Sequence, residues 1–183
     1  IFEKAGVKIG IIGLSIDEAI YSWRARPHEL LDPIGIARKR VAELRKQVDY
    51  VIALTHLGSK KDHKLVCAVK GLDLVVGGHD HVLLDTQQFD IDPDGRKVPI
   101  VQVGLHGQHI GEMWVRVAKG QPMAIENHVI HHNTLDQPED STIQREVEEV
   151  KADYEDIYQA YGPTWLHETL AVSEVPFEVS LDR

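Results

Sequence analysis

The amino-acid sequence predicts an α/β fold with a largely buried sheet over about the first two-thirds of its 183 residues. Short apolar runs of strand length alternate there with segments in which apolar residues recur at helical spacing. Hydrophobic residues make up 43% of the chain and charged residues 27%. These are ordinary values for a globular domain, so a wholly disordered or fibrous protein is excluded.

The first expected elements are a strand and a helix. Val7–Leu14 is a near-continuous apolar run, which is typical of a buried strand. Asp32 followed by Pro33 has the pattern of a helix N-cap and first turn, and apolar residues recur at helical spacing from there to Lys46. This segment therefore predicts an amphipathic helix that covers the sheet.

Five more elements complete the α/β region. They are a strand at Tyr50–Leu54, a helix capped by Asp62 that continues through Val69, and strands at Leu72–Val76, Val98–Val103 and Gly111–Val117. The last two strands are expected to form a mixed or antiparallel edge, and a turn at Asp92–Gly95 precedes them.

The pattern changes after about residue 125. A polar loop precedes Ser141–Gln144, which fits a capping box and predicts a helix with one apolar and one acidic face, ended by Gly162–Pro163. The strand-like runs Leu170–Val172 and Phe177–Val179 are typical of the start of another unit. Because the chain opens on Ile1 and not on Met, we expect it to be an excerpt from a longer protein.

Charge and composition narrow the class of partner. The chain has 20 Lys and Arg against 29 Asp and Glu, a formal charge of −9, which repels a phosphate backbone and argues against a general nucleic-acid binder. No apolar run approaches the roughly 20 residues of a membrane-spanning helix. The single cysteine, Cys67, cannot form an internal disulfide and is expected to be a small core residue.

Three of the 11 histidines occupy special places in the predicted sheet. His56, His79 and His81 each follow the carboxyl end of a predicted buried strand, which is where ligands collect in open α/β sheets. Gly77 and Gly78 are expected to let the backbone turn sharply, so that His79 and His81 point at different ions. Imidazole is a good ligand for Zn, Mn and Fe, so these residues predict a metal site.

The other histidines carry weaker signals. An exposed or structural role is expected for His28, His63 and His167, and an exposed cluster for His128, His131 and His132. His106 and His109 lie in or beside a glycine-containing turn, and their function stays open.

The motifs around the three strand-end histidines resemble a known family. Thr55–Gly58, the helix after it and Gly71–His81 resemble the second half of the calcineurin-like metallophosphoesterases, in their 5'-nucleotidase branch. The resemblance extends from about residue 5 to about residue 120. It implies a four-layer αββα sandwich with a C-terminal linker helix. It also implies two divalent metal ions (Mn, Zn, Fe or similar), one bound by His56 and His79 and the other by His81.

Two carboxylates near these histidines are candidate partners for the rings. Asp73 and Asp80 are candidates to bind the ring nitrogens that face away from the metal and so to orient the imidazoles. The alternative is that they are ordinary turn and loop residues. No catalytic residue is assigned. By the same resemblance, the family's other metal ligands come from motifs of the types Asp-x-His, Gly-Asp and Gly-Asn-His followed by Asp or Glu. None of these motifs occurs in this sequence, and the carboxylate that bridges the two ions is among the missing residues.

The missing motifs suggest how the chain is organised. Residues 1–125 are expected to be the second half of a metallophosphoesterase catalytic domain, residues 126–167 a loop and acidic linker helix, and residues 168–183 the start of a C-terminal nucleotidase domain. Without the bridging carboxylate, the chain alone is expected to be inactive. By resemblance, the full-length protein would be periplasmic, secreted or at the cell surface, although cytoplasmic members exist.

The resemblance favours hydrolysis of phosphate esters, above all of nucleoside 5'-monophosphates to nucleoside and phosphate. A 2',3'-cyclic nucleotide phosphodiesterase and a thiosulfate-ester hydrolase are alternatives on the same scaffold. A non-catalytic module that serves in binding or assembly is the alternative from another class. The expected partner is a small-molecule nucleotide or another phosphate ester, and the oligomeric state stays open.

Overall fold

The computed structural model describes residues 1–131, 138–157, 169 and 172. The chain divides into two compact units, Ile1–Asn133 and Thr134–Arg183. All the candidate metal ligands lie in the first unit. Among the described residues, no helix combines the length and the apolar character that a membrane span requires.

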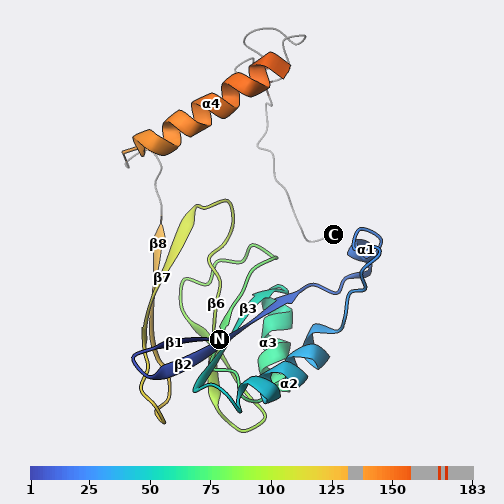
Figure 1. Cartoon of the computed structure of the whole chain (residues 1–183), viewed down its shortest axis with the longest axis vertical. Helices are drawn as coiled ribbons and strands as arrows, with labels where there is room; N and C mark the ends of the chain where they lie inside the picture. Colours follow the sequence, from blue (N-terminus) through green and yellow to red (C-terminus); the bar gives the residue numbers. More distant parts are fainter. Residues whose placement is uncertain (132–137, 158–168, 170–171, 173–183) are drawn as a thin grey trace. The chain divides into compact units, whose positions relative to one another are not determined.

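A six-stranded sheet is the centre of the first unit (Figure 1). Its strands in spatial order are β1 (Phe2–Lys4), β2 (Val7–Ser15), β3 (Tyr50–His56), β4 (Leu74–Val76), β6 (Lys97–Val101) and β5 (Gln88–Ile91). Neighbours from β2 to β6 run parallel, whereas β1 and β5 form antiparallel edges. The predicted α/β sheet is therefore confirmed. The expected edge is wrong, because β6 lies between β4 and β5, and the edge strands β1 and β5 were not predicted.

Helices α2 (Pro33–Leu44) and α3 (Ser59–Ala68) cover one face of this sheet (Figure 1). The Asp32 side chain caps α2, because its carboxylate accepts hydrogen bonds from the backbone N–H groups of Ile34 (3.1 Å) and Gly35 (2.9 Å). The predicted cap of α3 is wrong. That helix begins after Gly58, and Asp62 is buried inside its first turn.

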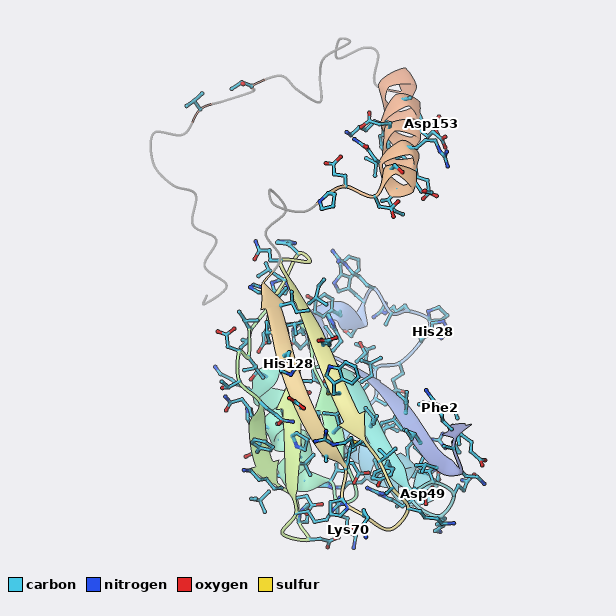
Figure 2. All side chains as sticks on the ribbon, turned by 90° about the vertical axis from the view of Figure 1, so that its left-hand side faces the viewer. Phe2, His28, Asp49, Lys70, His128 and Asp153 are labelled. Carbon is cyan, nitrogen blue, oxygen red and sulfur yellow. The ribbon has the colours of Figure 1, made fainter. Side chains whose placement is uncertain are left out.

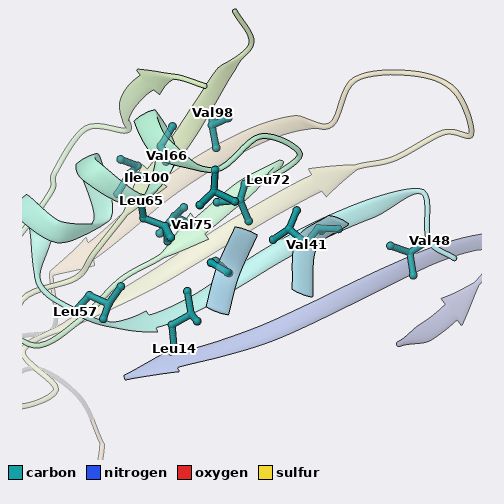
Figure 3. Packing of buried hydrophobic residues seen from close by; sticks show 14 residues of the cluster. Leu14, Val41, Val48, Leu57, Leu65, Val66, Leu72, Val75, Val98 and Ile100 are labelled. Atoms are coloured by element: carbon teal, nitrogen blue, oxygen red, sulfur yellow. The ribbon is translucent and has the colours of Figure 1, made fainter. Parts of the chain in front are cut away.

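The hydrophobic core fills the space between these helices and the sheet (Figure 3). Its fully buried members include Val41 of α2, Leu65 and Val66 of α3, and Val75 and Ile100 of the sheet. Cys67, expected in the core, is exposed instead. It follows the buried Leu65 and Val66 on α3, so its side chain falls on the outer side of the helix.

The opposite face of the sheet is open at several apolar residues. Along β3, Val51 and Ala53 belong to the core, whereas Leu54 between Ala53 and Thr55 is 55% exposed. Ile11 of β2 is also exposed. Because side chains alternate along a strand, His56 shares the face of Leu54, away from α2 and α3.

A separate two-stranded antiparallel sheet lies on the side of the main sheet away from α2 and α3 (Figures 1 and 2). It consists of β7 (His109–Arg116) and β8 (Ala124–His131). The Tyr50 hydroxyl binds the turn between them: it donates to the carbonyl of Gln121 (2.7 Å) and accepts from the N–H of Ala118 (3.1 Å). Part of the loop expected after residue 125 is a strand instead, because β8 continues to His131.

Two short segments remain. Helix α1 (Ala19–Ser22) follows β2 and was not predicted. In the second unit, the predicted acidic helix is confirmed as α4 (Ser141–Ile157). Its first turn is capped by Asp140 instead of Ser141, since the Asp140 carboxylate accepts from the N–H groups of Thr142 (2.8 Å) and Ile143 (3.1 Å). The expected stop at 162–163 and most of residues 168–183 lie outside the described residues.

Candidate metal centre

The loops after β3 and β4 meet at the carboxyl edge of the sheet. His56 is the last residue of β3, and the backbone N–H of Gly58 donates to the carbonyl of Gly78 (2.9 Å). This bond joins the loop that follows His56 to the turn that carries His79. Parallel neighbouring strands bring their carboxyl ends together, as the sequence predicted.

The turn after β4 is built differently from the expectation. The left-handed backbone conformations fall on His79 (φ 104°) and His81 (φ 61°), and not on Gly77 or Gly78. A side chain pays a steric cost of roughly 1–3 kcal/mol for such a conformation, which persists only where the surroundings enforce it, often at functional sites. His106 shares this feature (φ 57°). Three strained histidines therefore lie in loops of one unit.

Gly77 has another role, because a side chain there would collide with buried groups. A Cβ atom on Gly77 would overlap Oδ2 of Asp62 and lie 3.1 Å from Oε1 of Gln102. Both of these side chains are buried. The glycine thus lets the strand end pass directly over the Asp62 carboxylate, a contact that the sequence pattern did not reveal.

His56 and His79 form the closest pair of candidate ligands. The Nε2 atom of His56 lies 3.3 Å from Nδ1 of His79, and the ring centroids are 5.0 Å apart. Two imidazole nitrogens that bind one zinc ion at 2.0–2.1 Å in tetrahedral geometry are about 3.4 Å apart. The separation therefore matches that of two ligands of one cation, and in the metal-free chain the same contact is a hydrogen bond between the two rings.

His81 points elsewhere. Its ring faces that of His106, with centroids 6.2 Å apart. Among the residues that the structure describes, no group of three or more His, Cys, Asp or Glu side chains is arranged to hold a metal ion. The structure thus brings two of the three predicted ligands together and leaves His81 beside a fourth histidine, so the assignment of His81 to a second ion stays a prediction.

Asp80 holds the histidine turn in place. Its carboxylate accepts from the backbone N–H of Ser59 (2.7 Å), at the start of α3, and from Nε2 of Gln102 (2.5 Å). Burial acts to raise the pKa of Asp80, but the hydrogen bonds from Gln102 and from backbone N–H groups outweigh it and lower the pKa. Asp80 therefore binds the turn to α3 and β6, and in doing so caps the N-terminus of α3.

Asp73 lies at the other end of β4 and has a structural role. Its carboxylate accepts from the N–H of Val51 (2.7 Å), from Arg45 and from Arg96 (3.2 Å). Asp73 does not contact the imidazoles, since β4 separates it from the histidine turn.

A cavity of about 690 Å³ lies near this end of β4, and Arg38, Arg45 and Arg96 are among the residues that line it. All three arginines donate hydrogen bonds to backbone carbonyls, so they have structural partners there.

The remaining histidines have separate surroundings. His63 contacts Asp90, and His128 on β8 lies 3.3 Å from Glu126. His28 is exposed (Figure 2). The expected exposed cluster cannot be assembled from described side chains, because His132 lies outside the described residues and the side chain of His131 is not described. His167 also lies outside them.

Two residues of the segment after β2 were missed from the sequence. Asp17 and Glu18 lie beside Lys61 of α3, with Nζ of Lys61 2.9 Å from Oδ1 of Asp17 and 3.6 Å from Oε1 of Glu18. Glu18 also reaches His79, with Oε1 3.6 Å from Nε2 of the ring. An acidic pair before a short helix gave no local signal of this contact.

Comparison with known proteins identifies the family. No family model matches the chain. The chain is 30% identical over 176 residues to a snake venom 5'-nucleotidase from Macrovipera lebetinus, covering 86% of this chain and 42% of that protein. It is 28% identical over 165 residues to the trifunctional nucleotide phosphoesterase protein YfkN of Bacillus subtilis, covering 86% of this chain and 11% of that protein.

A solved structure agrees with these relatives. The 5'-nucleotidase precursor from Thermus thermophilus superposes with a TM-score of 0.67 at 28% identity, covering 85% of this chain and 33% of that one. The chain belongs to the 5'-nucleotidase branch of the calcineurin-like metallophosphoesterases. The predicted metallophosphatase fold class is thereby confirmed. This metallophosphoesterase chain spans less than half the length of each of these relatives.

Proposed function

We propose that this chain supplies histidine ligands to a dinuclear metal centre that hydrolyses phosphate esters, with nucleoside 5'-monophosphates as the substrate class. The observation that carries the proposal is the 3.3 Å separation between Nε2 of His56 and Nδ1 of His79 at the carboxyl edge of the sheet. The substrate class is supported by relatives named 5'-nucleotidase and nucleotide phosphoesterase.

The ligand types suit particular ions. In the proposal, His56 and His79 hold one divalent cation and His81 holds the other. Imidazole favours Zn, Mn or Fe over Mg, which prefers an all-oxygen shell. Such ions, when bound, polarise phosphoryl oxygens and lower the pKa of a bound water, so that hydroxide is available near neutral pH.

The protein's own groups prepare this centre. The Gly58–Gly78 backbone bond and the Asp80 carboxylate fix the two loops that carry His56 and His79. The exposed position of His56 leaves its ring accessible to a ligand from outside the sheet. The net charge of −9 does not oppose a phosphate substrate, because bound cations would be the largest local charges.

The proposed organisation follows from the same family. Residues 1–125 would form the second half of the catalytic domain, residues 126–167 would link it onward, and residues 168–183 would begin a C-terminal nucleotidase domain. Strand β8 pairs with β7 as far as His131, so the catalytic part would extend at least to that residue. The β7–β8 sheet lies on this side of the main sheet, and the open apolar face at Ile11 and Leu54 is where the rest of the second sheet of an αββα sandwich would pack.

The direct test is metal binding by the purified chain. Calorimetry with Mn²⁺ and Zn²⁺ should show affinity at least 10-fold weaker for His56→Ala and His79→Ala than for the unmodified chain. His28→Ala, which removes an exposed histidine from a loop, is the matched control and should leave affinity unchanged. Equal affinities for all the variants would overturn the proposed centre.

Activity gives the second test. Phosphate release from a nucleoside 5'-monophosphate should stay near background for the chain alone, since the bridging carboxylate is not among its residues. Metal-dependent turnover by the chain would contradict that expectation. For the protein that carries the complete centre, a panel of nucleoside 5'-monophosphate, 2',3'-cyclic nucleotide and a thiosulfate ester separates the proposed substrate class from its alternatives.

A further inference from the structure

We propose that Glu18 is a positioning residue for His79, which it holds in the tautomer and orientation that bind a cation through Nδ1. The inference rests on the proposed metal centre. Glu18 comes from a segment distant from His79 in the sequence, just after β2. The contact that carries the inference is between Oε1 of Glu18 and Nε2 of His79, at 3.6 Å.

The two nitrogens of the His79 ring face different partners. Nδ1 lies 3.3 Å from Nε2 of His56, and Nε2 faces the Glu18 carboxylate. A neutral imidazole carries one proton, and the carboxylate favours placing it on Nε2. The lone pair of Nδ1 then points toward His56, where the shared cation would lie. At 3.6 Å the contact is longer than a hydrogen bond, so Glu18 acts on the ring through its negative charge. A carboxylate beside the second nitrogen of a histidine ligand favours a proton on that nitrogen and raises the basicity of the ligand.

The sheet register explains why Glu18 arrives at this point. Ser15, the last residue of β2, pairs with His56 in the parallel β2–β3 ladder. The chain therefore leaves the sheet beside the end of β3, and Glu18 follows only three residues later. The ends of β2, β3 and β4 thus deliver the carboxylate and the two imidazoles to one place.

Lys61 of α3 forms ion pairs with both Asp17 and Glu18. Its ammonium group lies 2.9 Å from Oδ1 of Asp17 and 3.6 Å from Oε1 of Glu18. The hydrogen bond with Asp17 raises the pKa of Lys61, so the group stays charged. Since Lys61 belongs to the first turns of α3, it connects the segment after β2 to a rigid element.

A purely stabilising role does not account for this arrangement. The Glu18 side chain is 40% exposed and that of Lys61 34%, and partly exposed ion pairs of this kind contribute little to folding. His79, in contrast, has a left-handed backbone outside regular secondary structure, so its ring direction depends on side-chain contacts. The contacts of the two ring nitrogens are His56 and Glu18.

The deciding experiment reads the His79 tautomer directly. Long-range ¹H–¹⁵N correlation spectra of the metal-free chain at pH 8 should place the proton of His79 on Nε2. In Glu18→Ala the signal should shift toward a mixture of the two tautomers, and Glu18→Gln, whose amide oxygen can still accept, should shift less. Glu29→Ala removes the same charge from an exposed position in the same connecting segment and should leave the spectrum unchanged.

Metal affinity gives the size of the effect. Calorimetric Kd values for Zn²⁺ and Mn²⁺ should rise roughly 10- to 100-fold in Glu18→Ala, as is typical when the carboxylate behind a histidine ligand is lost. An unchanged His79 tautomer in Glu18→Ala would overturn the inference. If the unmodified chain binds neither ion, the proposed metal centre fails, whereas the tautomer measurement still decides the role of Glu18.

Discussion

The buried carboxylate of Asp62 makes the stability of this protein depend on pH. Asp62 is fully buried in the first turn of α3, and neither of its oxygens has a hydrogen-bond partner among the described residues. Burial is the largest effect and raises its pKa from 3.8 to about 6. The Thr55 hydroxyl opposes this rise, the negative charge of Asp80 adds to it, and His63 opposes it least. The charged form is therefore unfavourable in the folded state.

The sign and size of the effect follow from linkage. A folded pKa above the unfolded value means that stability is fully present below pH 3.8 and is lost as pH rises through about 6. A rise from 3.8 to about 6 corresponds to a loss of about 3 kcal/mol in the free energy of unfolding. About 1.4 kcal/mol of that loss falls between pH 5 and pH 8.

Asp62→Asn removes this titration and nearly preserves the shape of the side chain. We expect the free energy of unfolding of the variant, relative to the unmodified chain, to become more favourable by about 1.4 kcal/mol from pH 5 to pH 8. Urea unfolding followed by circular dichroism in metal-free buffer at several pH values measures this difference. Asp94→Asn is the control, because Asp94 is exposed.

The slope with pH, and not the absolute stability, is the decisive result. The amide introduced by Asp62→Asn packs differently from a carboxyl group, which changes stability by a constant amount at every pH. A difference between the two proteins that stays constant from about pH 5 to pH 8 would refute the reasoning, since it would mean that Asp62 titrates alike in the folded and unfolded chains.

Three further predictions concern stability. Gly77→Ala drives a Cβ into Oδ2 of Asp62, so thermal unfolding should occur at lower temperature, and Zn²⁺ affinity should fall as the histidine turn moves; an unchanged Tm would contradict this. Asp92→Asn should cost about 1–3 kcal/mol at pH 7, because burial acts to raise the pKa of Asp92 but hydrogen bonds from Arg96 outweigh it and lower the pKa. Urea unfolding should show this cost shrinking as the pH falls below the ordinary pKa of 3.8, and a cost independent of pH would argue against it. Leu65→Ala should cost about 2–5 kcal/mol in urea unfolding, because the side chain is fully buried between α3 and the sheet, whereas a loss below about 1 kcal/mol would mean that the core can collapse into the space.

Local signals in the sequence were enough for the main strands and helices. The Asp32–Pro33 pair marked the start of α2 because a cap and a first-turn proline act within a few residues. Strands β2 and β3 were evident because each is a short run rich in apolar residues, at least one face of which packs in the core. The apolar face of α4 was evident for a similar reason, although its cap is Asp140 and not Ser141.

Elements whose stability depends on distant partners escaped prediction. Strands β1 and β5 are short edges of the sheet, and β8 is half exposed, so none has an apolar pattern of its own. Asp62 has the residue type of a helix cap, but Asp80 supplies that carboxylate from another loop and leaves Asp62 inside. Local propensity cannot report a hydrogen bond that joins residues far apart in the sequence.

The sequence by itself determined the place of the histidines: His56 and His79 follow neighbouring parallel strands, so the sheet must bring them to one edge. Only the tertiary structure decided which ring nitrogens meet, that His81 faces His106, and that Glu18 lies behind His79. Strand order follows from patterns repeated over many residues. The direction of an imidazole depends on one backbone angle and on contacts from separate segments, which come together only when the chain has folded.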